Sequence, residues 1–163
     1  MTETTLTEES LSRLAQRARD TLGACPNCAQ ASFLTLQEEF DLPRDAVLKA
    51  LTPFPGIALR GETCGAVIGS VMALGLVYGR DDIDDAAAFA GSLTPARRFC
   101  RRFERENGST RCEEILEARM GRKFNLADRV EAAEYASAGG MQVCSEVVAS
   151  AVLAAAELIA PRK

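Results

Sequence analysis

The stretch that decides the fold is Cys64-Gly-Ala-Val-Ile-Gly-Ser-Val-Met-Ala-Leu-Gly-Leu-Val-Tyr78. Read at helical spacing it is apolar on every side, which predicts a helix buried at the centre of a bundle. Gly65, Gly69 and Ala73 recur at every fourth position, a spacing that lets a neighbouring backbone approach closely. Because the stretch is shorter than the ~20 residues that span a bilayer, we expect no membrane span here.

Helical signals continue on both sides of this stretch. We expect helices over residues 7–22, from Pro26 to Phe40, from Pro43 to Leu51, over 64–78, from Thr94-Pro95 to Gly108, from a capping box at Thr110-Arg-Cys-Glu113, over 127–136, and from Gly140 to about Ile159. No stretch alternates as a strand does. The sequence therefore predicts an all-α domain, a compact bundle of about six to seven helices around the glycine-containing central helix.

Charge and composition limit the partners of this domain. Its 163 residues suit a single domain, and the net charge of −4 argues against a nucleic-acid partner. The first residues, Met1-Thr-Glu-Thr-Thr, carry neither a basic nor an apolar leader, so we expect a cytoplasmic protein. Six cysteines in that compartment are expected to be reduced, as metal ligands or redox thiols.

The absence of histidine narrows the chemistry further. A Cys-x-x-Cys-His haem attachment, Cys–His catalysis and mixed Cys/His zinc sites all need a side chain that the chain lacks. No haem is therefore expected. A site for a soft metal would have to use cysteine alone, or cysteine with oxygen ligands.

Most cysteines fall near predicted helix starts. These are Cys25, Cys28, Cys64, Cys112 and Cys144, whereas Cys100 lies in the middle of a predicted helix. The free N–H groups and partial positive charge of a helix N-terminus stabilise a thiolate and lower the pKa of a cysteine. The alternative is that each is a small buried hydrophobic residue, which is common for free cysteine.

The spacing of these cysteines resembles a known family of redox-active proteins named for its pattern C, GCAxxG, C, C. The matching stretches are Asn27-Cys-Ala-Gln30, Gly61-Glu-Thr-Cys-Gly-Ala-Val-Ile-Gly69, Gly75-Leu-Val-Tyr-Gly79, Asn107-Gly-Ser-Thr-Arg-Cys112 and Cys144. The resemblance implies a family core over about residues 25–160, with residues 1–24 as an additional N-terminal helix. It places the signature cysteines at Cys28, Cys64, Cys112 and Cys144, with Cys25 and Cys100 as extras. The related split-Soret cytochromes carry haem and an iron–sulfur centre on a similar domain, and only the iron–sulfur or thiol part can apply here.

Three hypotheses follow for the function. The first is electron transfer through an iron–sulfur cluster bound by the four signature cysteines, since four thiolates match the ligand count of such clusters. The second is thiol–disulfide exchange, with Cys25 and Cys28 as a pair, or Cys64 with a distant partner, so that Cys28 and Cys64 are the candidate catalytic residues. The third is a structural four-cysteine zinc site or a plain helical interaction module.

Two further features have functional and structural interpretations. Gly61, Gly65 and Gly69 are candidate contacts for a cofactor beside Cys64, and their spacing equally fits close helix packing. The arginines between Arg97 and Arg105 are either a docking patch for an acidic redox partner protein or an ordinary solvated helix face. The glycine-lined segment also leaves room for a homodimer.

Overall fold

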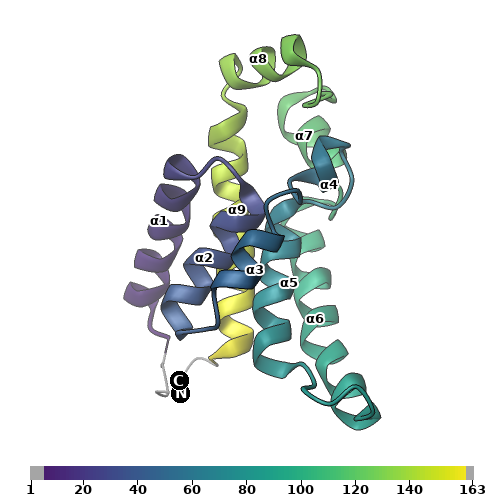
Figure 1. Ribbon diagram of the computed structural model, residues 1–163. Helices are drawn as coiled ribbons and strands as arrows, with labels where there is room; N and C mark the ends of the chain where they lie inside the picture. Colours follow the sequence, from purple (N-terminus) through teal and green to yellow (C-terminus); the bar gives the residue numbers. More distant parts are fainter. Residues whose placement is uncertain (1–5, 161–163) are drawn as a thin grey trace.

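The protein is all-helical, as predicted. The computed structural model describes residues 6–160, and within them nine helices are arranged as a bundle with shorter helices at one end (Figure 1). The helices are α1 (Glu8–Ala24), α2 (Cys28–Phe40), α3 (Asp45–Ala50), α4 (Gly56–Leu59), α5 (Gly65–Tyr78), α6 (Ala86–Asn107), α7 (Cys112–Met120), α8 (Arg129–Ser137) and α9 (Gly140–Ile159). No strand longer than an isolated bridge occurs in this part of the chain.

The core lies between the long helices. Helix α9 packs on α1, α2, α5 and α6, and α5 packs on α2, α6 and α9. The approach of α2 to α5 is unusually close, because a Cβ atom at Gly69 would lie 2.2 Å from the carbonyl oxygen of Ala29. Glycine is therefore needed where the two helices cross.

Helix α5 is buried on one side only, which differs from the prediction of a helix buried all round. Ala66, Ala73 and Leu74 face the core, whereas Met72 and Leu76 are exposed. No other described helix covers that outer side. The most continuous buried surface belongs to α9, where Val148, Val152 and their neighbours are inaccessible to solvent.

Helix α9 also has membrane-like composition. By length and hydropathy it is the one helix among residues 6–160 that could cross a bilayer, a test that core helices of soluble proteins pass as well. In the fold, α9 packs against other helices of the same chain and most of its apolar residues are buried there.

The predicted helix start at Thr94-Pro95 is wrong. Pro95 lies inside α6, which begins at Ala86 and is capped by Asp85, whose side chain accepts a hydrogen bond from the backbone N–H of Ala88 at 2.8 Å. Proline has no backbone N–H, so the carbonyl four residues earlier lacks its helical hydrogen-bond donor. That carbonyl belongs to Gly91, which is exposed and can be solvated instead.

Three other predicted boundaries shift by a few residues. Helix α1 continues through Gly23 to Ala24, so Gly23 does not end it. Helix α2 begins at Cys28 rather than at Pro26, because the Asn27 side chain caps it. Helix α3 begins two residues after Pro43.

The capping box predicted at Thr110-Arg-Cys-Glu113 does not form. The residue before α7 is Arg111, and no side chain caps the helix. Instead its first amides bond to a distant loop: Cys112 N–H donates to Glu62 O at 2.7 Å, and Glu113 N–H donates to Gly61 O at 3.1 Å. Tertiary pairing has therefore replaced the local cap.

Candidate functional site: a cysteine cluster at one end of the bundle

Two loops far apart in sequence pair at the end of the bundle where the short helices lie. Thr63 and Arg111 form an antiparallel bridge, and Cys64 N–H donates to Thr110 O at 2.8 Å. The residue before α5 is Cys64, and no side chain caps this helix. The pairing of the two loops brings Cys64 and Cys112 to the same end of the molecule.

Cys28 reaches this end as the first residue of α2. Asn27 fixes the helix start, since its side-chain oxygen accepts hydrogen bonds from the N–H groups of Ala29 at 3.1 Å and Gln30 at 3.0 Å. The sulfur of Cys28 lies against the start of α5, where a Cβ atom at Gly65 would be only 2.5 Å away. Gly65 therefore makes room for the Cys28 sulfur.

The thiols of Cys28 and Cys64 are in direct contact. The pKa of Cys28 is lowered below the ordinary value of 9.0, mainly because the Cys64 thiol donates a hydrogen bond to its sulfur. The backbone N–H groups of Gly65 and Ala29 stabilise the Cys28 thiolate further, against the opposing effect of burial. The pKa of Cys64 is raised well above 9.0 by the same hydrogen bond and by burial. Of the two thiols, Cys28 is therefore the one that ionises more readily.

Cys112 and Cys144 complete the cluster as protonated thiols. Burial is the main cause that raises the pKa of Cys112 to about 12 and that of Cys144 to about 11. The Tyr135 hydroxyl donates a hydrogen bond to the Cys144 sulfur at 3.0 Å. Burial also raises the pKa of Tyr135, so its hydroxyl stays protonated.

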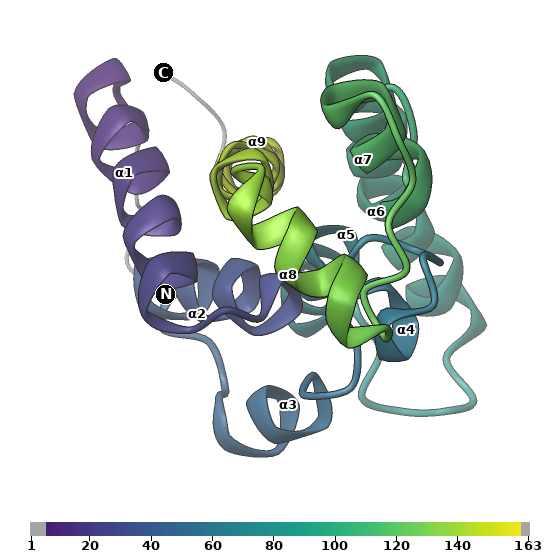
Figure 2. The same ribbon diagram turned by 90° about the horizontal axis from the view of Figure 1, so that it is seen from above.

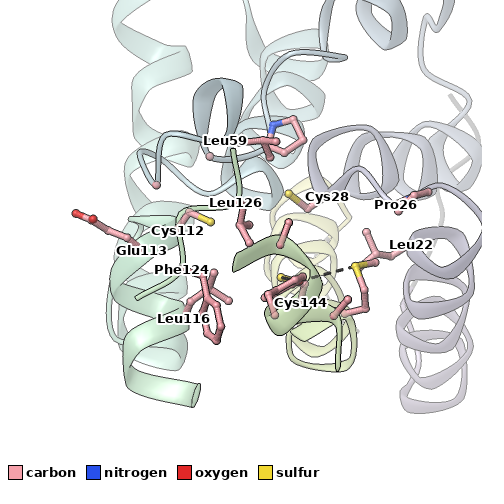
Figure 3. A pocket seen from close by; sticks show the side chains of 17 residues that line it. Leu22, Pro26, Cys28, Leu59, Cys112, Glu113, Leu116, Phe124, Leu126 and Cys144 are labelled. Carbon is pink, nitrogen blue, oxygen red and sulfur yellow. Dashed lines mark hydrogen bonds between the residues drawn. The ribbon is translucent and has the colours of Figure 1, made fainter. Parts of the chain in front are cut away.

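Three of these cysteines face a cavity of about 270 Å³. Figure 3 shows Cys28, Cys112 and Cys144 around it, one each from α2, α7 and α9. The complete lining is Leu22, Pro26, Cys28, Pro55, Gly56, Leu59, Gly61, Cys112, Glu113, Leu116, Phe124, Leu126, Ala132, Tyr135, Ala136, Met141 and Cys144. Cys64 is buried behind this wall.

One wall of the cavity has a left-handed backbone. Gly56, Ile57, Ala58 and Leu59 all have positive φ, between 48° and 63°. Such a turn costs roughly 1–2 kcal/mol for each residue other than glycine. Gly56 itself packs against Cys112, since a Cβ atom there would lie 3.4 Å from the sulfur. A strained loop thus supports the cysteine cluster.

The remaining predicted site residues lie outside the cluster. The Cys25 thiol contacts Gln30 Oε1 at 3.8 Å, and Cys100 lies within α6, where burial raises its pKa. Gly61 lines the cavity, whereas Gly65 and Gly69 pack against α2.

The arginine face of α6 is mostly solvated. Arg102 is the exception, because it pairs with Glu157 and Glu106 at 2.8 Å each. Arg97, Arg98, Arg101 and Arg105 are exposed.

Metal coordination was the leading expectation for the signature cysteines. Among residues 6–160, no three cysteine or carboxylate side chains are arranged as a group that could hold a metal ion. All six cysteines are free thiols. The four sulfurs have the donor chemistry of a cluster site, but their arrangement is that of a thiol pair with two neighbours.

Two contributors to the site were absent from the sequence predictions. Tyr135 bonds Cys144, and its ring occupies the space that a side chain at Gly140 would fill, 2.0 Å from the ring carbon Cε2. The Gly139-Gly140 pair in the sequence indicated a position where a neighbouring side chain packs closely against the backbone. Gln30 ties α2 to α3 through Leu48 O at 2.9 Å and to the turn after α3 through Thr52 Oγ1 at 3.1 Å, and nothing in the sequence indicated that role.

Fold and site together define an all-helical protein with a cysteine cluster at its helix starts. Residues 26–158 match the family described as "Putative redox-active protein (C_GCAxxG_C_C)", and the chain belongs to that family. Helix α1 precedes the matched region. No curated protein and no solved structure matches the chain significantly.

Proposed function

We propose that this protein carries out redox chemistry by reversibly forming a disulfide between Cys28 and Cys64. The observation that carries the proposal is the juxtaposition of Cys28, at the start of α2 against Gly65, with Cys64, the residue before α5, whose thiols shift each other's pKa in opposite directions. A thiolate is the nucleophile in thiol–disulfide chemistry, and its partner thiol must lie within reach to complete the bond. In this chain Cys28, the more readily ionised thiol, and its partner Cys64 lie together in one buried site.

The two cysteines have different roles in this reaction. Cys28 attacks the oxidant because its sulfur faces the cavity and is the more acidic of the pair. Cys64 then closes the disulfide from the buried side. Oxidation of two protonated thiols to the disulfide releases two electrons and two protons, one proton fewer when Cys28 is already ionised, and the electrons pass to the oxidant. Thiol pairing between Cys25 and Cys28 has less support, because the Cys25 thiol is directed to Gln30.

A redox titration tests the proposal. The protein is equilibrated in thiol–disulfide buffers of different potential, its free thiols are alkylated, and the disulfide is mapped by mass spectrometry. We expect a two-electron transition, about 30 mV per tenfold change in the ratio of forms. The linked peptides should contain Cys28 and Cys64.

Matched variants sharpen this test. Cys28→Ser and Cys64→Ser should each abolish the transition, and Cys100→Ser should leave it intact because Cys100 lies on α6 outside the cluster. A constant thiol count across the titration would contradict the proposal, and so would a disulfide that joins other cysteines.

Iron–sulfur binding by Cys28, Cys64, Cys112 and Cys144 is the second candidate. Its support is the grouping of the four thiols, whose charges influence one another's pKa. Iron and acid-labile sulfide analysis after anaerobic purification separates the candidates, and the same analysis detects zinc. Stoichiometric iron and sulfide would favour the cluster, and stoichiometric zinc would favour a structural site.

A further inference from the structure

Cys28 lies between the cavity and Cys64, so the two cysteines differ in their access to a molecule in the cavity. Cys28 lines the cavity, whereas Cys64 is outside the lining and only 6% exposed. A molecule in the cavity therefore meets Cys28 first. Cys64 can complete a disulfide from the other side without competing for that molecule.

The lining of the cavity selects against charge. Its side chains are overwhelmingly aliphatic or aromatic, and Glu113 is the one carboxylate among them. The Glu113 carboxylate is paired with Arg111 at 2.8 Å and Lys123 at 3.6 Å, and it points away from the cavity (Figure 3). A charged ligand would lose its hydration here without gaining a partner.

The cavity also selects for small size. Its volume of about 270 Å³ lies just below the usual range for small-molecule pockets, ~300–1,000 Å³. Helix α8 lies across this end of the bundle, and α4 and α7 border the same region (Figures 1 and 2). A disulfide substrate must align its two sulfurs with the attacking sulfur and carries a substituent on each of them. A hydroperoxide presents one small terminal oxygen to the attacking sulfur, so it needs less space.

We infer that the cavity binds a small, neutral, apolar organic hydroperoxide as the oxidant of Cys28. This inference rests on the proposed dithiol function and names the substrate class of the same site. The apolar group of the hydroperoxide occupies the space between Leu116, Phe124 and Leu126. Its terminal oxygen then lies toward the Cys28 sulfur.

The reaction balances in two steps. The Cys28 thiolate attacks the terminal oxygen and the O–O bond breaks. The sulfur loses two electrons, the alkoxide that leaves takes one proton from the Cys144 thiol, and Cys144 regains a proton from solvent while Tyr135 keeps its hydrogen bond to the Cys144 sulfur. Cys28 is then a sulfenic acid. The Cys64 thiol attacks that sulfur, forming the disulfide and releasing water. Overall, two thiols and one hydroperoxide give one disulfide, one alcohol and one water.

The test compares cumene hydroperoxide with hydrogen peroxide. Rates of Cys28 oxidation are measured by mass spectrometry on the full reduced chain, and the same chain unfolded in guanidinium gives the intrinsic reactivity of each peroxide. We expect folding to raise the ratio of the two rates, cumene hydroperoxide over hydrogen peroxide, by about tenfold or more, since tenfold corresponds to ~1.4 kcal/mol of apolar contact. An unchanged or reduced ratio overturns the inference.

A pair of variants on α8 locates the effect. Ala132→Phe fills the cavity that Ala132 lines, and Ala133→Phe places the same ring on the exposed side of the helix. The first should abolish the preference and the second should keep it. Equal preference in both variants overturns the inference. If Ala132→Phe does not fold, the inference is tested by the change on folding in the wild-type ratio of the cumene hydroperoxide rate to the hydrogen peroxide rate.

A binding measurement separates this inference from the proposed function. Cumyl alcohol, the product of cumene hydroperoxide, should shift the NMR signals of Tyr135 and Phe124 in Cys28→Ser, which cannot react. Saturable shifts support the cavity assignment, and their absence overturns it. If disulfide-forming reagents fail to link Cys28 to Cys64, the proposed function itself fails. If they succeed without any peroxide preference, only the inference fails.

Discussion

The helical body and the cysteine end of this protein are built in different ways. In the body, α2, α5 and α9 pack through small residues, with Ala29, Ala66 and Ala155 fully buried and glycine where α2 crosses α5. At the cysteine end, α4, α7 and α8 are short, a left-handed turn lines a cavity, and a separate small apolar cluster forms around Leu116 and Tyr135. Close packing leaves little free volume in the helical body, whereas the cysteine end contains a cavity.

This difference shows how one chain can be both rigid and reactive. Close packing in the body fixes the starts of α2 and α5, and so fixes Cys28 and Cys64 relative to each other. The cysteine end contributes strain and open volume, which cost stability but leave Cys28 accessible. Substitutions in the two regions should therefore have different consequences.

The largest effect is expected from a methyl group added where α2 meets α5. Gly69→Ala should lower the free energy of unfolding by about 3 kcal/mol, because the added Cβ would lie 2.2 Å from the Ala29 carbonyl oxygen. Gly75→Ala on the same helix is the control. It has nothing within 4 Å and should raise stability by about 0.5–1 kcal/mol. Urea unfolding measures both, and similar values for the two would contradict the close approach.

A smaller effect is expected at alkaline pH. Cys112 and Cys144 have pKa values of about 12 and 11 in the folded protein, above the ordinary value of 9.0. Above pH 9 the unfolded chain ionises these thiols and the folded chain does not, so the unfolded state binds fewer protons and stability falls. At ~1.4 kcal/mol per pKa unit, the two thiols together should cost about 3 kcal/mol between pH 8 and pH 10.

Denaturant unfolding at the two pH values measures this loss. A variant with both Cys112→Ala and Cys144→Ala provides the control, because alanine cannot ionise. Its stability should change less over the same interval. An equal loss in the variant and the wild type would show that other groups cause it.

The smallest effect concerns the left-handed turn beside the cavity. Ala58 has φ 57° and ψ 37° and is exposed, so Ala58→Gly removes strain without removing a packed side chain. We expect a stability gain of about 0.5–1 kcal/mol. The same change at Ala133, in the right-handed helix α8, should cost about 1 kcal/mol. Thermal melts of both variants measure the contrast, and a loss of stability at Ala58 would contradict the strain.

Sequence patterns predicted the helical class and the long helices near their observed bounds. The predicted helix boundaries were wrong where tertiary contacts, rather than local sequence, determine where a helix begins or ends. Local rules start a helix at Thr94-Pro95, but α6 already begins at Ala86, and the exposed carbonyl of Gly91 tolerates the hydrogen bond that Pro95 cannot donate. Local rules also cap α7 at Thr110, but pairing with Gly61 and Glu62 takes the first amides of that helix. The left-handed turn at Ile57 and Ala58 has no sequence signal, because both residues disfavour it.

The candidate site was predictable in part. Helix-start placement predicted a lowered pKa for five cysteines, whereas among the four signature cysteines the pKa is lowered at Cys28 and raised at the other three. The Gly65 position indicated a close approach, which is found against Cys28 and Ala29. Sequence could not show that Cys64 bonds Cys28, because the partner of a thiol depends on how α2 and α5 cross. Nor could it show the cavity, whose lining comes from seven separate stretches of chain, from Leu22 to Cys144.

The pH dependence of alkylation tests the central claim most directly. Iodoacetamide reacts with thiolates, and mass spectrometry gives the rate at each cysteine from pH 5 to pH 10. Cys28 should react faster at pH 7 than Cys112 or Cys144, and its rate should be half-maximal below pH 9.0, the ordinary cysteine pKa. Cys64→Ala, which removes the donor to the Cys28 sulfur, should move that midpoint upward. A Cys28 that reacts no faster than Cys112 and Cys144, or a midpoint unchanged by Cys64→Ala, would contradict the account.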